Sequence, residues 1–158
     1  MAVSFCPQGN HTITPHLVIR GAKKALEFYK RAFGASEVMI MPGPDGESVA
    51  HAEMRIGDSL VYLADEWPGA PISSPSKLGG TSVSIHMYVK DCDAVFNQAV
   101  AAGAKVSMPL MNMFWGDRYG TVTDPFGHEW GIATHVEDVS PEVMAKRAAE
   151  AFKQMGKC

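Results

Sequence analysis

Polar and apolar residues follow the same order twice along this chain. Residues 16–19 alternate like a half-buried strand, and an amphipathic helical pattern of about twelve residues follows and ends at Gly34. The order returns at residues 86–89, where an alternating stretch leads into a helical pattern that begins at Asp91 and ends at Gly103. Aspartate is a favoured N-cap residue, and glycine commonly follows the last helical turn. The repetition predicts two copies of one structural unit.

Both predicted helices carry one apolar face, which is expected to pack on the sheet of its own unit. Apolar residues recur at three- and four-residue spacing, as in a helix that covers a core. They are Ala25, Leu26, Tyr29 and Phe33 in the first helix, and Val95, Phe96, Ala99 and Val100 in the second.

Two matching hairpins follow the helices. The segments IGDSL (56–60) and FGHEW (126–130) occupy equivalent places, so each half reads as a strand, a helix and about three further strands. The pattern predicts an α+β fold of two tandem βαβββ modules. The expected organisation is an N-terminal segment (1–10), a first module (11–66), a Pro/Gly/Ser-rich linker (67–80), a second module (81–136) and a C-terminal helical tail (137–158).

The C-terminal tail predicts one more helix. Ser140 can act as its N-cap, Pro141 suits the first helical position, and the helix should extend to about residue 155. Its face could cover the chain's own sheet or that of a partner. The candidate apolar contacts are Val143, Ala148, Phe152 and Met155.

Composition narrows the class of protein. The 158 residues are 46% hydrophobic and 20% charged, with a formal net charge of −3. This balance recruits neither nucleic acid nor an anionic membrane, and no apolar stretch approaches the roughly 20 residues needed to span a bilayer. Three widely spaced cysteines favour neither a zinc knuckle nor a disulfide framework, and no signal-peptide pattern is found. We expect a cytoplasmic protein.

Two motifs, together with the repeat, resemble the vicinal oxygen chelate superfamily of glyoxalase I, bleomycin-binding proteins and extradiol dioxygenases. They are the FYxxxFGA signature at residues 28–35 and the DPxGH hairpin at residues 124–128. The segments TPHLVIRGAKKALEFY, WGDRYGTVTDPFGHEW and ATHVEDVSPE are similar to its PhnB-like branch. The resemblance implies a curled mixed sheet around a cleft that holds a small organic molecule. It also implies a homodimer.

The resemblance further implies where a metal would bind. Members of the superfamily place one ligand on the first strand of each module and one four residues after each hairpin glycine. Those positions are Thr14, Ser84, Val61 and Gly131 in this chain. None of these side chains is a good ligand for zinc, nickel, manganese or iron, so the standard metal site is expected to be missing, and the sequence indicates no particular cofactor.

The hairpins also predict strand registers. A DPFG turn with Gly127 in the left-handed conformation would leave one extra residue in the loop. The expected pairs are Asp124–His128, Thr123–Glu129 and Thr121–Gly131 in the second module and, by transfer of the same spacing, Glu53–Ser59 and His51–Val61 in the first.

Strand alternation then points five ionisable side chains into the cleft, which makes them candidates for proton transfer. They are His16, His51, Glu53, His86 and Glu129. Each could instead be a hydrogen-bonded structural residue. A divalent metal held by His16, His86 and Glu129 is a further alternative, although strand geometry leaves a mismatch of roughly 13 Å between these positions.

A second group of residues is predicted to contact the ligand. Met113, Trp115 and Arg118 lie where the long connection after the second helix re-enters the sheet, and Tyr88 and Thr121 share the cleft side of their strands. The alternative is a loop anchored by the tryptophan and an Arg–Asp pair. Trp130 and Ile132 are predicted core residues, and His128 is predicted to be structural.

Three functions agree with these patterns. The first is a protein that binds or transforms a small organic molecule without the standard metal site, through histidine and glutamate. The second is a metal-dependent lyase, isomerase or dioxygenase of the glyoxalase type. The third is a non-catalytic module that sequesters a drug or meets a protein partner. The loss of all four ligand positions favours the first.

Overall fold

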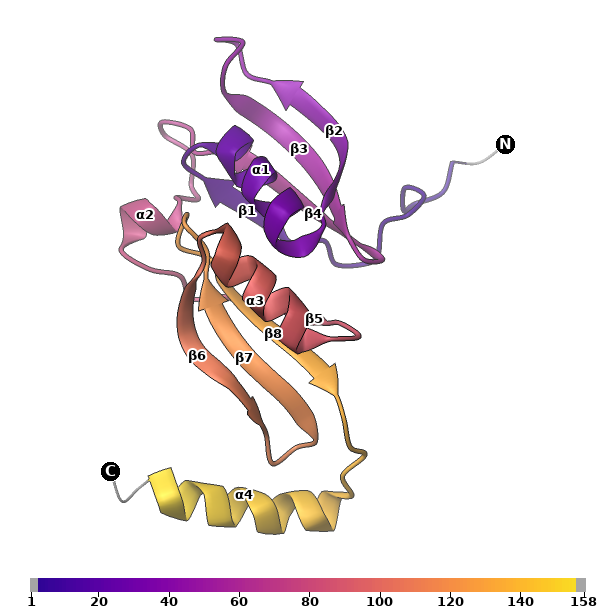
Figure 1. The fold of residues 1–158 in the computed structure, drawn as a ribbon. Coiled ribbons are helices and arrows are strands. Elements are labelled where there is room, and N and C mark those ends of the chain that lie inside the picture. The colour runs from indigo at the N-terminus through magenta and orange to yellow at the C-terminus, as the bar shows by residue number, and fades with distance from the viewer. Residues whose placement is uncertain (1–2, 156–158) are drawn as a thin grey trace.

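The computed structural model describes residues 3–155 and contains two βαβββ modules (Figure 1). In the first module the four strands are ordered β1-β4-β3-β2, with β1 parallel to β4 and the other pairs antiparallel. The elements are β1 (His16–Ile19), α1 (Ala22–Phe33), β2 (Ser36–Pro42), β3 (Val49–Ile56) and β4 (Ser59–Asp65).

The second module repeats this topology, with strand order β5-β8-β7-β6 and β5 parallel to β8. Its elements are β5 (Ser84–Tyr88), α3 (Cys92–Ala102), β6 (Lys105–Asn112), β7 (Asp117–Thr123) and β8 (Glu129–His135). The short helix α2 (Pro75–Leu78) lies between the modules, and α4 (Pro141–Met155) follows the second. The predicted α+β class, the two modules and the C-terminal helix are confirmed.

Helices α1 and α3 each cover one face of their own sheet and pack side by side (Figure 1). The opposite face of each sheet carries no helix, and we call it the open face. The two sheets remain separate four-stranded mixed sheets. Because both helices lie on the same side of the molecule, the two open faces lie next to each other rather than opposite each other.

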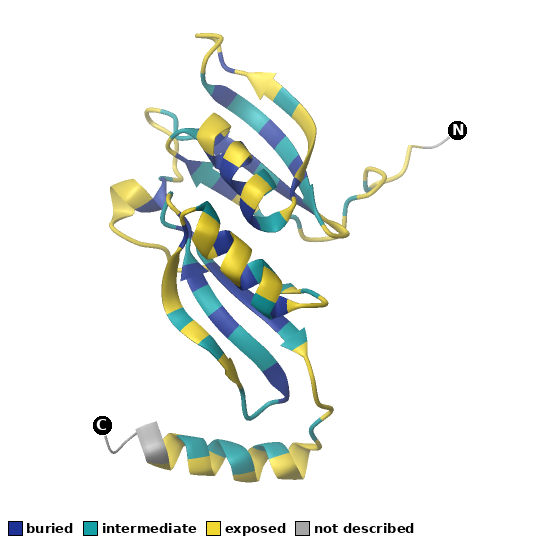
Figure 2. Ribbon diagram, viewed as in Figure 1, coloured by how far each residue is buried: buried dark blue, intermediate teal, exposed yellow. Residues whose placement is uncertain are grey.

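The core lies between the helices and the covered faces of the sheets (Figure 2). Trp130 and Ile132 are buried there, as the sequence predicts, and the Tyr29 ring packs between those of Trp130 and Phe28. The predicted contact of Val100 is wrong, because this residue is 38% exposed at the outer edge of the α3 face that packs through Phe96 and Ala99.

The helix ends follow the sequence signals. The Asp91 side chain accepts a hydrogen bond from the backbone N–H of Ala94, and Gly34 and Gly103 adopt the left-handed conformation at the C-termini of α1 and α3. Ser140 accepts a hydrogen bond of 3.4 Å from the Val143 N–H at the start of α4.

Helix α4 lies beyond the β6–β7 end of the second module (Figure 1). Two of its predicted apolar contacts are exposed, because α4 packs little against the rest of the chain. These residues are Val143 and Phe152, although the Phe152 ring still touches Phe114 at a centroid distance of 5.9 Å. The side chain of Met155 lies outside the described residues.

The register prediction is right for one hairpin and wrong for the other. In the second module Thr123 pairs with Glu129 and Thr121 with Gly131, and the Asp124 N–H donates to the His128 carbonyl across a turn with Gly127 at φ 93°.

In the first module the loop is shorter, because Ile56 pairs directly with Ser59 around the two-residue turn Gly57-Asp58. Glu53 therefore lies opposite Tyr62 rather than Ser59, and Val61 pairs with Met54 rather than with His51.

Candidate functional site

The open face of the first module carries a cluster of polar aromatic residues. His16 on β1 lies beside Tyr62 on β4 in the strand register, and the His16 ring is 5.9 Å from the His51 ring on β3. The His51 and Tyr62 rings are 4.9 Å apart, and His51 Nε2 lies 3.5 Å from a carboxylate oxygen of Glu53. Partial burial, then the nearby His51, lower the pKa of His16.

The N-terminal segment reaches this cluster. The Asn10 side-chain amide donates a hydrogen bond to the Tyr62 hydroxyl, and Gly9 lies against the Arg55 guanidinium. Tyr62 is thus held between the N-terminal segment and the sheet.

The open face of the second module carries a larger arrangement, a ring of aromatic side chains around Asp117. The His86 ring on β5 stacks on the Tyr119 ring of β7 at 5.2 Å with 15° between their planes. His86 also lies 4.8 Å from Tyr88, and Tyr119 lies 6.0 Å from Trp115. Tyr88 and Trp115 both donate hydrogen bonds to Asp117, which closes the ring.

Asp117 is 2% exposed and accepts three side-chain hydrogen bonds. They come from His135 Nδ1 (2.8 Å), the Tyr88 hydroxyl (2.9 Å) and Trp115 Nε1 (3.0 Å). Burial by itself would raise the pKa of Asp117, but the hydrogen bonds from His135, Tyr88 and Trp115 bring it below its usual value. The bond to Asp117 in turn raises the pKa of the Tyr88 phenol. Asp117 is therefore a buried carboxylate that stays ionised.

Gly131 provides the space for the His86–Tyr119 stack. A Cβ atom at this position would lie 2.8 Å from Tyr119 Cε2 and 3.1 Å from His86 Nδ1. Real Cβ atoms essentially never approach as closely as the first of these distances, so a side chain at position 131 requires the rings to move. The resemblance assigns position 131 to a metal ligand, but in this chain the position lies under the His86 and Tyr119 rings. Glycine leaves room for the two rings to stack there.

The four positions implied for metal ligands do not fit a metal ion in this chain. Thr14 and Ser84 are weak donors, Gly131 has no donor, and Val61 is buried on the covered face. The implied position in the first module is wrong by one residue because of the shorter hairpin. Tyr62 lies beside His16 as Gly131 lies beside His86, so Tyr62 is the structural equivalent.

The alternative metal triad is also not assembled within one chain. His16 lies on the first sheet, whereas His86 and Glu129 lie on β5 and β8 of the second. Glu129 accepts hydrogen bonds from Thr123 Oγ1 (2.8 Å) and Ser107 Oγ (3.1 Å). Across residues 3–155, no three His, Cys, Asp or Glu side chains converge on a point that could hold a metal.

The residues predicted to contact a ligand separate into two groups. Trp115 and Tyr88 belong to the ring around Asp117, and Thr121 lies opposite Gly131 on the same open face. Arg118 instead forms two hydrogen bonds of 2.5 and 2.6 Å with Asp93 at the start of α3, on the covered side. Met113 closes the preceding turn through its backbone N–H, which donates to the Asp117 carbonyl.

A crevice of about 700 Å³ runs between the two modules, along β5. Its volume suits a small organic ligand. His86 and Tyr88 border it, so it adjoins the aromatic ring of the second module. Apolar side chains from both modules form much of its wall, among them Ile13, Phe33, Val61, Met87, Val95 and Trp130.

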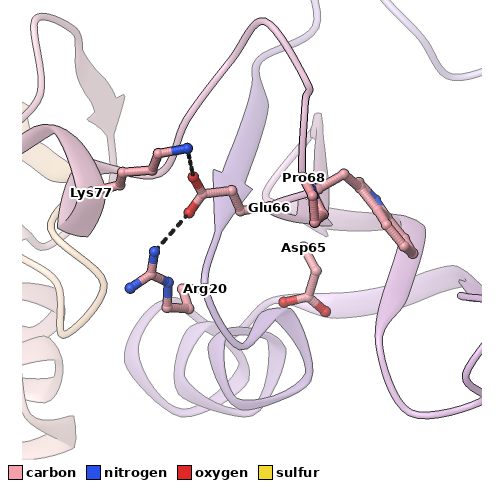
Figure 3. A pocket seen from close by; sticks show the side chains of 6 residues that line it. Arg20, Asp65, Glu66, Pro68 and Lys77 are labelled. Atoms are coloured by element: carbon pink, nitrogen blue, oxygen red, sulfur yellow. Dashed lines mark hydrogen bonds and ion pairs between the residues drawn. The ribbon is translucent and has the colours of Figure 1, made fainter.

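A smaller cavity of about 340 Å³ lies at the carboxyl ends of β1 and β4 (Figure 3). Glu66 lies in it between Arg20 (3.2 Å) and Lys77 (3.1 Å), and it accepts a hydrogen bond from the Ser74 hydroxyl. The bond from Ser74, followed by the contact with Lys77, lowers the pKa of Glu66 to about 2. Both cations are already paired, so we interpret this cavity as a clamp that fastens α2 to the first module.

Four residues of these clusters were not among the site residues predicted from the sequence. They are Tyr62, Asp117, Tyr119 and His135. A signal existed for three of them. The predicted register of the second hairpin, continued to the far end of the strands, places Tyr119 opposite Ala133 and Asp117 opposite His135, as observed. For Tyr62 no such signal existed, because the transferred register was wrong.

Comparisons with known proteins agree with the fold. The family model described as Glyoxalase/Bleomycin resistance protein/Dioxygenase superfamily matches residues 10–132. An uncharacterised protein of Mycobacterium bovis is 44% identical over 154 residues, covering 95% of this chain and 98% of the relative.

Solved structures extend the comparison. The structure of the Arabidopsis thaliana At5g48480 product has a TM-score of 0.62 and 30% identity, and the match covers 78% of this chain and 98% of that one. A PhnB protein from Bacillus cereus has a TM-score of 0.62 at 20% identity, covering 78% of this chain and 99% of that one. Within the described residues, no helix has the length and apolar character needed to cross a membrane.

Proposed function

Because this chain belongs to the Glyoxalase/Bleomycin resistance protein/Dioxygenase superfamily, we propose that it binds a small organic molecule with a flat, apolar part. The ligand lies in the crevice along β5, against His86 and Tyr88. Binding uses these side chains rather than the standard metal site of the superfamily.

The observation that carries this proposal is the crevice itself. It has the volume of a ligand site, its wall is largely apolar, and His86 and Tyr88 supply polar groups on one side. Aromatic rings favour stacked or edge-on contacts with another ring at centroid distances of about 4.5–7 Å, so the exposed faces of His86 and Tyr88 suit an aromatic ligand.

We also propose that the site is completed in a homodimer. In one chain the open faces lie side by side, and Tyr88 is 63% exposed. A second copy that placed its first module against the second module of its partner would cover Tyr88 and bring the His16–His51–Tyr62 cluster toward the ligand. Exposed apolar residues on the edge strands β2 and β6, such as Met41 and Met111, provide surface for such pairing. Sedimentation equilibrium tests this point, with twice the monomer mass as the expected result and the monomer mass as the contradicting one.

Gly131→Ala tests the ligand site, with Gly80→Ala as its matched control. The added methyl group displaces the Tyr119 and His86 rings at position 131 but meets nothing within 4 Å at position 80. A panel of flat aromatic compounds is screened by thermal shift, and the Kd of each compound that binds is measured by calorimetry. We expect binding to weaken at least ten-fold in Gly131→Ala and to be unchanged in Gly80→Ala. Equal affinity in both variants, or no binding of any compound, contradicts the proposal.

A further inference from the structure

The pair His135–Asp117 has the geometry of an oriented acid–base group. His135 Nδ1 lies 2.8 Å from Asp117 Oδ1. Because an ionised carboxylate can only accept, Nδ1 carries the proton, and the second ring nitrogen, Nε2, is the one available for chemistry. Tyr88 and Trp115 fix Asp117 from its other side, so the imidazole is held by a carboxylate that cannot turn away.

The Nε2 atom is accessible. Its partner is Asp138 Oδ1 at 3.0 Å, and the Asp138 side chain is fully exposed in the segment after β8. Exposed ion pairs contribute little free energy, so a ligand group can replace Asp138 at small cost. The His135 side chain itself is 51% exposed.

The position of His135 connects it to the proposed ligand site. Alternation along β8 places His135 on the same open face as Gly131, and Asp117 joins His135 to Tyr88 at the border of the crevice. A ligand stacked beside His86 and Tyr88 therefore lies next to the end of the strand that carries His135.

The His135–Asp117 pair is not needed to hold the ends of β7 and β8 together. The backbone N–H groups of Val136 and Glu137 already donate to the Gly116 carbonyl at 2.9 and 3.0 Å, at the same end of β7 and β8. A buried carboxylate that collects three donors and presents an imidazole to solvent is not needed for that purpose.

We propose that His135, oriented by Asp117, exchanges a proton with an acidic hydroxyl group of the ligand, such as a phenol or an enol. The acceptor is the neutral form of His135, with its single proton on Nδ1 and with Asp138 turned away from Nε2. The proton passes from the ligand oxygen to Nε2, which leaves a phenolate or enolate beside an imidazolium that Asp117 stabilises. The reverse transfer restores both groups, so no oxidant, reductant or other reactant is needed. His135 is the group that touches the ligand, and Asp117 is a positioning residue. This inference rests on the proposed function and names the chemistry of its ligand.

The two carboxylates beside His135 make its ring more basic. The hydrogen bonds to Asp138 and then to Asp117 raise the pKa of His135 above its usual value. Tyr88 acts on it only through Asp117. When a ligand replaces Asp138, Asp117 continues to stabilise the protonated ring.

The test uses 4-nitrophenol, whose phenolate absorbs visible light while the neutral phenol does not. Binding is measured by calorimetry, and the ionisation of the bound probe is followed by absorbance as a function of pH. We expect the pKa of the bound probe to fall by about one unit in the native protein, a ten-fold change in its ionisation constant. The downward shift should disappear in His135→Gln and shrink in Asp117→Asn, but persist in Asp138→Asn.

The outcomes separate the two proposals. If 4-nitrophenol or another flat aromatic compound binds but the pKa of the bound probe is unchanged, or falls equally in His135→Gln, this inference fails and the proposed function stands. If neither 4-nitrophenol nor any other flat aromatic compound binds, both fail. The melting temperature of each variant is recorded, and His135→Asn serves as a second substitution if His135→Gln does not fold.

Discussion

The Tyr29 hydroxyl of the first module donates a 2.6 Å hydrogen bond to the carboxylate of Asp124 in the second module. Asp124 is 4% exposed and also accepts hydrogen bonds from Trp130 Nε1 and from the backbone N–H groups of Phe126 and His128. Burial, followed by the charge of Asp124, raises the pKa of the Tyr29 phenol well above its usual value. One turn residue thus ties the helix of one module to the core of the other.

Tyr29→Phe should destabilise the protein by about 1.5–3 kcal/mol, because it removes a buried hydrogen bond to a charged group. The free energy of unfolding in urea measures the effect. Tyr62→Phe is the control, since its hydroxyl is only partly buried and its partner Asn10 is neutral. We expect a smaller loss of unfolding free energy in the control. Equal losses in the two variants would show that the Tyr29–Asp124 hydrogen bond contributes no more stability than the partly buried one.

His128 should make the protein less stable in mild acid. Burial lowers the pKa of His128 below 6.5, and its Nε2 atom is buried without a partner in the described structure. Between the lowered pKa and 6.5 the unfolded chain binds more protons than the folded one, so the free energy of unfolding falls as the pH decreases through this window. The lowered pKa of His16 also decreases the free energy of unfolding as the pH falls, whereas the raised pKa of His135 increases it. In denaturant titrations from pH 7.5 to 5, His128→Gln should show a shallower decrease than the native protein, and an identical decrease contradicts this role.

Gly120→Ala should cost about 1–3 kcal/mol of stability through overpacking. A Cβ atom there would lie 2.9 Å from Phe96 Cε2 and 3.0 Å from the backbone nitrogen of Leu110, and the backbone cannot yield easily. Gly80→Ala again serves as control and should be neutral or slightly stabilising, because alanine restricts the unfolded chain. A neutral effect of Gly120→Ala in chemical denaturation would mean that β6 and α3 are not packed this closely.

Glu66→Gln should release the segment between the modules. The substitution removes the charge that holds Arg20 and Lys77 around the start of this segment (Figure 3). Limited proteolysis of the native protein and the variant measures the effect, and we expect faster cleavage within residues 67–80. Glu150→Gln, at an exposed position of α4, should leave the cleavage rate unchanged. The clamp should also weaken in acid, because the stability contributed by a carboxyl with a lowered pKa is lost as the pH falls from 4.5 toward 2.

Interactions between residues close together in the sequence were sufficient to predict much of the fold. The repeat, the glycine ends of α1 and α3, the Asp91 cap and the register of the second hairpin depend on residues close together in the sequence, and these predictions are confirmed. The predicted register of the first hairpin is wrong, because a two-residue turn at Gly57-Asp58 replaces the longer DPFGH loop and the spacing does not transfer. One consequence was that Tyr62 was overlooked and Val61 was assigned to the wrong face.

The sequence by itself determined which residues can stand on the open faces, since strand alternation is a property of the backbone. Only the tertiary structure decided which of them meet. His16 gathers with His51 and Tyr62 on one sheet, His86 stacks on Tyr119 above Gly131 on the other, and Glu129 bonds to neither group. The bond between Tyr29 and Asp124 forms only when α1 packs against the second module, and the bond between Tyr88 and Asp117 only when β5 and β7 both pair with β8.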